Sequence, residues 1–133
     1  MFNLFEDKFV IEENIAFQLN PQSLAFLGDA VFSLYVRLKI CSHSTAKSGV
    51  LHKKTTEQVK ATHQSELLIK LLPILTDKEQ QLIKRARNTK VNNMAKHASA
   101  EQYKLSTAFE ALLGYLYISG NFDRLKYLLE QCI

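Results

Sequence analysis

The sequence is poor in the residues that disulfide-stapled, fibrous and membrane-spanning proteins need. Its 133 residues include two cysteines, two prolines and four glycines. Cys41 and Cys132 lie far apart and form no C-x-x-C pair, so no disulfide framework is predicted and a reducing compartment is expected. No apolar run approaches the roughly 18 residues that cross a bilayer, and the acidic start, MFNLFEDKF, does not resemble a signal peptide. We therefore expect a cytoplasmic protein with no membrane partner.

What the sequence does contain is the composition of one compact domain. Hydrophobic residues make up 47% of the chain and charged residues 23%, which excludes a disordered or fibrous class. A chain of this size buries about two-thirds of its unfolded surface, so it needs no metal or disulfide for stability. We predict a single domain over residues 1–133, with 1–19 as a peripheral segment.

The helical signals predict an all-α fold. Asn20-Pro21 is typical of a helix start, and the helix that follows is predicted to run to about Ile40. Residues 51–75 are predicted to be helical in two pieces, with their apolar run broken by Pro73. Capping boxes at Thr76 and Ser99 predict two further helices, and a last one follows Gly120. In the helix from Pro21, an apolar stripe at helical spacing is the expected core face: Leu24, Leu27, Val31, Leu34, Tyr35 and Leu38.

The positive charge is concentrated in one segment. The chain carries a formal charge of +4, yet between Lys84 and Lys104 six basic residues face a single acid, so the rest of the chain is close to neutral. Residues 88–98, inside this segment, have few apolar anchors and are predicted to be an exposed loop. A local excess of this kind indicates contact with a polyanion, although a solvated charge run on a helix end gives the same pattern.

Two acids occupy the most apolar stretches of the chain. Asp29 lies in LAFLGDAVFSLYV and Glu110 in AFEALLGYLYI. Because both faces of the first helix are apolar, we expect it to be buried nearly all round, and a buried carboxylate needs a partner. Gly28 and Gly114, beside the two acids, leave room for something to approach.

Three arrangements would satisfy such a pair of acids. Each acid can bond a buried Arg or a backbone donor, the two can share a proton, or they can jointly bind a cation. Mg²⁺ accepts one or two carboxylates together with waters and phosphate oxygens. Two such acids beside a polyanion-binding loop favour phosphodiester hydrolysis.

Four segments resemble the Mini-III ribonucleases, the small members of the ribonuclease III family that consist of the endonuclease domain alone. In order and spacing these segments are LAFLGDAVFSLYVR, LHKKTT, KRARNTK and YKLSTAFEALLGYLY. The resemblance runs from about residue 20 to the C-terminus. It implies a helical homodimer that cleaves double-stranded RNA with Mg²⁺, in the maturation of precursor 23S ribosomal RNA. Whether a ribosomal protein assists on the substrate stays open.

The resemblance also assigns the site residues. Asp29 matches the metal-binding aspartate of the family and Glu110 its essential glutamate, so both are expected to be catalytic and to hold the metal. Two further acids of full-length ribonuclease III are replaced here by Ala25 and Thr107, as in Mini-III, and Arg85-Ala86-Arg87-Asn88 stands where the family commonly has R-G-R-N.

Two groups of residues are predicted to contact partners. The basic segment is expected to bind the phosphates and 2′-hydroxyls of duplex RNA, through Arg85, Arg87, Asn88, Lys90 and Lys96. The first signature helix is expected to form the dimer interface, through Phe26, Leu27, Ala30 and Leu34, although the same side chains could be intramolecular core. A non-catalytic duplex-RNA-binding module of the same fold is the competing interpretation, and a helical adaptor whose acids are paired internally is a third.

Overall fold

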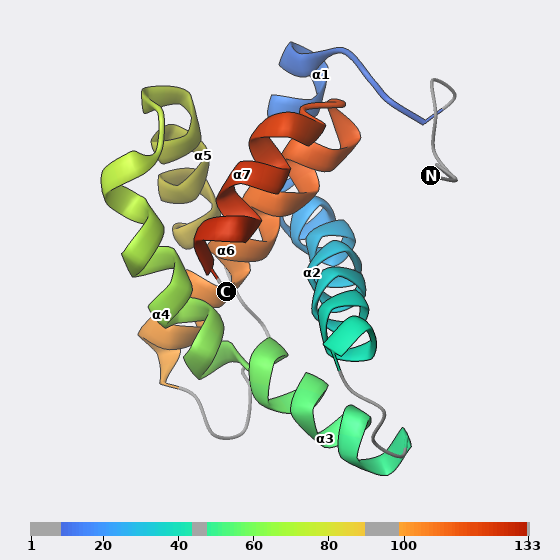
Figure 1. Ribbon diagram of the computed structural model, residues 1–133. Coiled ribbons are helices and arrows are strands. Elements are labelled where there is room, and N and C mark those ends of the chain that lie inside the picture. The colour runs from blue at the N-terminus through green and yellow to red at the C-terminus, as the bar shows by residue number, and fades with distance from the viewer. Residues whose placement is uncertain (1–8, 44–47, 90–98, 133) are drawn as a thin grey trace.

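Every regular element that the structure describes is a helix, as the sequence predicts. The computed structural model describes residues 9–43, 48–89 and 99–132 (Figure 1). The helices are α1 (Glu13–Phe17), α2 (Pro21–His43), α3 (Ser48–Val59), α4 (Ala61–Leu71), the 3-10 turn η1 (Leu72–Ile74), α5 (Asp77–Arg87), α6 (Ala100–Ile118) and α7 (Phe122–Cys132). None of these helices has the length and hydropathy to span a membrane.

Helix α6 is the central element of the fold. It packs against α2 along most of its length and also against α4, α5 and α7, which surround it in Figure 1. Between Leu105 and Leu116 every side chain is buried except Thr107 and Glu110, which are partly exposed. These two positions lie three residues apart and so share one face of the helix. The only break in the burial of this stretch of α6 therefore coincides with the second of the two acids.

The buried face of α2 differs from the predicted one. The side chains that enter the core are Leu24, Ala25, Phe32 and Val36, together with Gly28. Phe32 packs edge-to-face on Phe109 of α6, with ring centroids 5.0 Å apart. The predicted stripe is wrong in phase: only Leu24 of its members is buried, and Leu34 and Leu38 are more than half exposed. Both faces of α2 are apolar, so hydrophobic periodicity could not select the one that packs on α6.

The helix ends follow the predicted capping chemistry. Asn20 accepts a hydrogen bond from the Gln22 amide at 2.8 Å. Thr76 with Glu79, and Ser99 with Gln102, each form a complete reciprocal capping box. At the end of α6, Gly120 adopts φ +77°, a left-handed conformation that favours glycine. The break between α3 and α4 falls at Lys60, and Pro73 adds the 3-10 turn.

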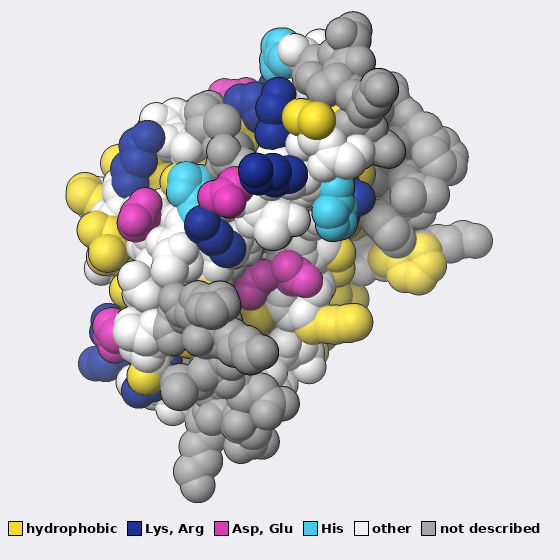
Figure 2. All heavy atoms as spheres, turned by 90° about the horizontal axis from the view of Figure 1, so that it is seen from below, with side chains coloured by type: hydrophobic (Ala, Val, Ile, Leu, Met, Phe, Trp, Pro, Cys, Tyr) yellow, Lys and Arg dark blue, Asp and Glu magenta, His cyan; other side chains and the backbone are white. Residues whose placement is uncertain are grey.

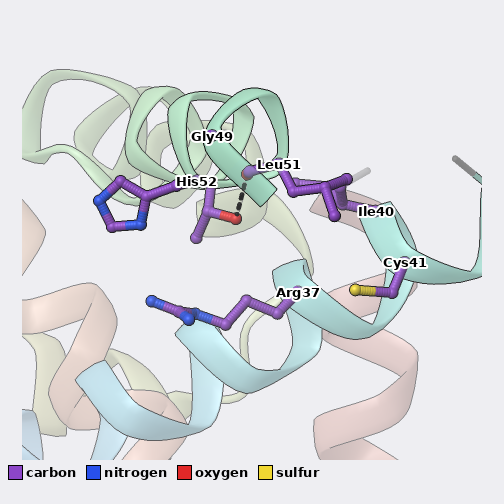
Figure 3. Close-up of a pocket in the computed structure, with 7 residues that line it drawn as sticks. Arg37, Ile40, Cys41, Gly49, Leu51 and His52 are labelled. Atoms are coloured by element: carbon purple, nitrogen blue, oxygen red, sulfur yellow. Dashed lines mark hydrogen bonds between the residues drawn. The ribbon is translucent and has the colours of Figure 1, made fainter. Parts of the chain in front are cut away.

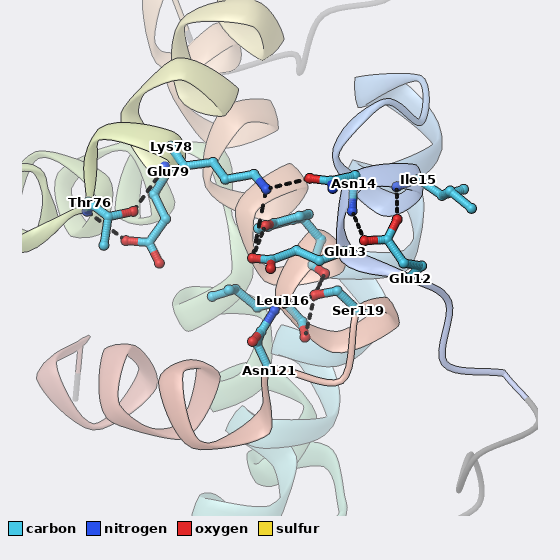
Figure 4. Close-up of polar contacts among 11 residues, drawn as sticks. Glu12, Glu13, Asn14, Ile15, Thr76, Lys78, Glu79, Leu116, Ser119 and Asn121 are labelled. Carbon is cyan, nitrogen blue, oxygen red and sulfur yellow. Dashed lines mark hydrogen bonds and ion pairs between the residues drawn. The ribbon is translucent and has the colours of Figure 1, made fainter.

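Polar contacts join the outer helices to one another and join α1 to the central helix α6. Arg124 of α7 donates to both carboxylate oxygens of Glu79 on α5, at 2.8 and 3.0 Å. Burial raises the pKa of the Glu79 carboxyl, but the hydrogen bonds from Arg124 and Thr76 outweigh this and the net pKa is lowered. Near the start of α5, Lys78 donates to Asn14 at 3.2 Å (Figure 4). Because Tyr115 of α6 also donates to Glu13 at 2.8 Å, the short helix α1 is fastened to the central helix.

Candidate active site

The two acidic residues are brought together by a close crossing of α2 and α6. Gly28 and Gly114 face each other at this crossing. A Cβ added at Gly28 would lie 1.7 Å from the carbonyl oxygen of Glu110, and one added at Gly114 would lie 2.0 Å from that of Leu24. Only glycine permits this approach, since any Cβ would overlap the opposing backbone. The group that the two glycines admit is thus the backbone of the other helix.

Asp29 and Glu110 sit next to these glycines and interact directly. Their carboxyl groups are within hydrogen-bonding and electrostatic range of each other. The expectation that the first helix encloses Asp29 on all sides is wrong, because Asp29 is exposed. Of the apolar residues one turn away on α2, Ala25 and Phe32 enter the core. They pack against the rest of the chain and leave Asp29 uncovered. The pair therefore lies at the surface, with Asp29 toward solvent and Glu110 beneath it.

Glu110 is held in an environment that disfavours its charged form. Burial, followed by the hydrogen bond and the negative charge of Asp29, raises the pKa of the Glu110 carboxyl to about 9. The amide of Gln64 acts in the opposite direction and lowers it. Without a cation, then, the pair holds a proton at neutral pH, which is one of the three arrangements considered from the sequence.

The pair also suits a divalent cation. Hard oxygen donors are the ligands that Mg²⁺ prefers, and one or two carboxylates are enough when water completes the shell. Within the described ranges no group of three or more His, Cys, Asp or Glu side chains could hold a metal, and Ala25 is buried where full-length ribonuclease III has an acid. Asp29 and Glu110 would therefore be the protein ligands, at a position open to solvent.

A third polar side chain at the site was not predicted from the sequence. Gln64 of α4 is 1% exposed, and its Oε1 accepts a hydrogen bond from the Ser106 hydroxyl of α6. Within the described part of the chain, its Nε2 has no hydrogen-bond partner of good geometry. The segment KATHQSELL gives no sign of this, because Gln64 becomes notable only when α4 packs against α6.

The predicted RNA-binding residues occupy different environments. Arg85 points toward α1: its guanidinium donates to the carbonyl oxygens of Phe17 and Leu19 and stacks 4.9 Å from the Phe17 ring. Arg87 is exposed and pairs with Glu101 at the start of α6, and Asn88 is exposed at the end of α5. Lys90 and Lys96 lie outside the described residues. Of the three described positions, Arg87 and Asn88 are open to a partner, whereas Arg85 is engaged within the chain.

A row of side chains along α2 leads from the acids to a cavity. Asp29, Ser33 and Arg37 follow one another at four-residue spacing, and the Arg37 Nε lies 3.3 Å from the Ser33 hydroxyl. Arg37 lines a cavity of about 550 Å³ between the end of α2 and α3, together with Ile40, Cys41, Gly49, Leu51, His52 and Thr55 (Figure 3). Figure 2 shows that one face of the molecule carries acidic side chains together with several Lys, Arg and His side chains.

The predicted interface residues lie on the opposite side of α2 from the core. Phe26 is 72% exposed and Leu34 56% exposed, Ala30 is exposed and Leu27 partly so. Leu27 also lines a small apolar hollow of about 210 Å³ with Phe9, Val10, Tyr117 and Ile118. Phe26, Ala30 and Leu34 are thus not part of the intramolecular core of the described chain.

This arrangement of helices and acids defines the chain as a ribonuclease III-type endonuclease domain. The family model "Ribonuclease III domain" matches residues 22–121. The crystal structure of a protein from Fusobacterium nucleatum is similar, with a TM-score of 0.77 and 28% identity over 85% of this chain and 90% of that one. The helical fold is therefore shared with a solved structure.

Curated proteins named Mini-ribonuclease 3 are similar over most of the chain. The protein from Thermoanaerobacter sp. is 40% identical over 100% of this chain and 94% of its own length. The protein from Streptococcus pneumoniae is 40% identical over 86% and 91%, and that from Brevibacillus brevis is 42% identical over 84% of both. The chain belongs to the Mini-ribonuclease 3 group of the ribonuclease III family and is an endoribonuclease.

Proposed function

We propose that this endoribonuclease hydrolyses double-stranded RNA at Asp29 and Glu110 with Mg²⁺ as its cofactor. The observation that carries the proposal is the Gly28–Gly114 crossing, which holds two carboxyl groups together at the surface. Two adjacent carboxylates repel each other, and a divalent cation held by both residues would remove that cost. A fold that needed only stability would place apolar side chains here.

Asp29 and Glu110 have different roles in the proposed site. When bound, Mg²⁺ polarises the phosphodiester, lowers the pKa of a bound water and stabilises charge on the leaving 3′ oxygen. Asp29, which is exposed, presents its carboxylate where a duplex can approach. Glu110 must lose its proton before it can act as a ligand, because its pKa is about 9 in the metal-free protein. Cation binding is therefore coupled to proton release. By family resemblance the products carry 5′-phosphate and 3′-hydroxyl ends.

Incubation with a long RNA duplex tests the proposal. The parent protein, an Asp29→Asn variant and a chelator control are run side by side, after the fold of the variant has been confirmed. Cleavage by the parent alone, abolished by chelation, is the expected result. Binding of the duplex without cleavage would instead identify a non-catalytic RNA-binding module, and neither binding nor cleavage would leave an adaptor with internally paired acids.

Duplex binding is expected to depend on Arg87 more directly than on Arg85. Replacing Arg87 with Ala removes an exposed cation and should weaken duplex affinity about fivefold, with a shallower dependence on salt. Replacing Arg85 with Ala removes the ties to Phe17 and Leu19, so we expect it to lower the free energy of unfolding as well. Affinity measured across a salt series checks both, with Lys126→Ala, exposed on α7, as the control. Equal affinity for Arg87→Ala and the parent at every salt concentration would contradict the assignment.

The exposed apolar face of α2 supports a two-fold homodimer. One site cuts one strand, and a two-fold pair of sites can cut both strands of a duplex. Replacing Phe26 with Glu places a charge in the proposed interface and should shift the protein to a monomer in sedimentation, while circular dichroism stays that of the parent because Phe26 is 72% exposed. A monomeric parent at working concentration would remove the dimer from the proposal.

The proposed substrate is a stem of precursor 23S ribosomal RNA. This follows from the resemblance to Mini-III ribonucleases and from relatives that share 40% identity with the chain. Cleavage of a transcribed precursor, mapped with and without ribosomal proteins, tests both the substrate and the need for an assisting protein.

A further inference from the structure

The feature that the proposed site leaves unexplained is a buried amide with an unused donor. Gln64 is 1% exposed, yet only one end of its amide is bonded in the described structure: Oε1 accepts from the Ser106 hydroxyl, and Nε2 has no partner of good geometry. Leaving a buried N–H group unpaired is unfavourable, because the group loses its hydrogen bond to water. An apolar side chain of the same size would avoid that cost, so the amide is expected to have a use beyond packing.

The position of Gln64 indicates what its donor serves. Gln64 comes from α4, whereas Ser106 and Glu110 lie one turn apart on α6 and point to the same face. The Gln64 amide is close enough to the Glu110 carboxyl to affect its protonation. Ser106 is also buried, at 6% exposure. Gln64 therefore lies between a fixed hydroxyl and an acid of the proposed site.

In the structure the carbonyl end of the Gln64 amide faces Ser106. A hydroxyl that donates to Oε1 holds the carbonyl end of Gln64 toward Ser106, so the NH₂ end is left for Glu110. An N–H donor forms a stronger hydrogen bond with a carboxylate than with the remaining acceptor oxygen of a protonated acid. The pairing thus improves when Glu110 is ionised, which is the form that a cation requires.

We propose that Gln64 is a positioning residue, whose Nε2 donates to the ionised Glu110 carboxylate and fixes its orientation for a divalent cation, while Ser106 locks the amide in place. The inference rests on the proposed function, because it assumes that Glu110 is a metal ligand. Groups outside the ligands that orient them typically change metal affinity by 10–100-fold. Gln64 and Ser106 act in this way through Glu110 and do not touch the substrate.

Calorimetry with Mn²⁺ alone, in the absence of RNA, tests the inference. We expect Gln64→Leu to weaken Mn²⁺ binding about tenfold, because Glu110 loses the donor that orients its carboxylate. Ser106→Ala should weaken binding about threefold, whereas Ser106→Thr, which keeps the hydroxyl, should match the parent. Ser65→Ala is the matched control: Ser65 neighbours Gln64, is 3% exposed and donates to the Thr62 carbonyl of its own helix.

The possible outcomes separate this inference from the proposed function. A parent that binds Mn²⁺ and cleaves duplex RNA, with a folded Gln64→Leu that binds Mn²⁺ within twofold of it, overturns the inference alone. If Gln64→Leu does not fold, the serine variants decide, and equal affinities for Ser106→Ala and Ser106→Thr overturn it. A parent that neither binds Mn²⁺ nor cleaves overturns the proposed function and the inference together.

Discussion

Replacing Glu110 with Gln is expected to abolish cleavage while making the metal-free protein more stable. The amide cannot supply a carboxylate to a cation, and a cation at a phosphodiester is worth several kcal/mol in the transition state, so cleavage should fall at least ~100-fold. The same amide resembles the protonated acid that the fold prefers. We therefore expect the free energy of unfolding at pH 8 to rise by about 2 kcal/mol.

The stability difference between Glu110→Gln and the parent should depend on pH in a defined direction. The pKa of Glu110 is raised in the folded protein, from 4.5 to about 9, so the folded state binds more protons than the unfolded state between these values. Stability of the parent accordingly falls as pH rises through that window. The advantage of Glu110→Gln should be absent near pH 4, grow above pH 5 and level off near pH 9.

Thermal unfolding of the metal-free proteins at several pH values measures this difference. Glu130→Gln is the matched control, since Glu130 is exposed on α7 and makes only a loose pair with Lys126. Added Mg²⁺ should raise the melting temperature of the parent and leave that of Glu110→Gln unchanged. A Glu110→Gln variant less stable than the parent at pH 8 would show that the carboxylate is compensated within the chain.

Replacing Gly28 with Ala should be among the most damaging single changes to this protein. Alanine is the better helix former by about 1 kcal/mol, but its Cβ would lie 1.7 Å from the carbonyl oxygen of Glu110. Relief requires α2 and α6 to move apart, which opens the core around Phe32 and Phe109 and separates the two acids. We expect the free energy of unfolding to fall by about 3 kcal/mol and cleavage to be lost even where the protein folds.

A second helical glycine provides the control for this experiment. Among the residues that the structure describes, no atom lies within 4 Å of a Cβ added at Gly49 of α3. Gly49→Ala should therefore leave stability unchanged or raise it by up to about 1 kcal/mol. Urea unfolding and duplex cleavage of both variants check the prediction. A Gly28→Ala protein as stable and as active as the parent would mean that α2 and α6 do not cross as closely as the structure shows.

The contrast between these glycines shows where sequence reasoning works on this chain. Local chemistry predicts the helix ends correctly, because the caps at Thr76, Ser99 and Gly120 depend on neighbouring residues alone. Asp29 and Glu110 are also conspicuous in the sequence itself, because each is an acid within an apolar segment. Local chemistry does not say that Gly28 is essential and Gly49 is not, since only the packing of α6 distinguishes them.

Other features of the site depend on contacts between distant parts of the chain. The buried face of α2 was mistaken because both of its faces are apolar, and periodicity has no means of choosing between them. Arg85 looks like any other cation of the basic segment until its guanidinium meets Phe17 and Leu19, more than 60 residues away. The role proposed for Gln64 likewise cannot be predicted from its neighbours in the sequence, because it depends on contacts with Ser106 and Glu110 of another helix.

The end of α5 and the start of α6 are each closed by hydrogen bonds between neighbouring residues. At the end of α5 the Asn88 amide bonds back to the Lys84 carbonyl, and α6 starts with the self-contained box of Ser99 and Gln102. Neither helix terminus relies for these bonds on the residues between Thr89 and Ser99. Closing a flexible connection between two fixed ends costs only about 0.6 kcal/mol more for each doubling of its length. A change of sequence between the two helices therefore leaves these end bonds in place, and with them the start of the helix that carries Glu110.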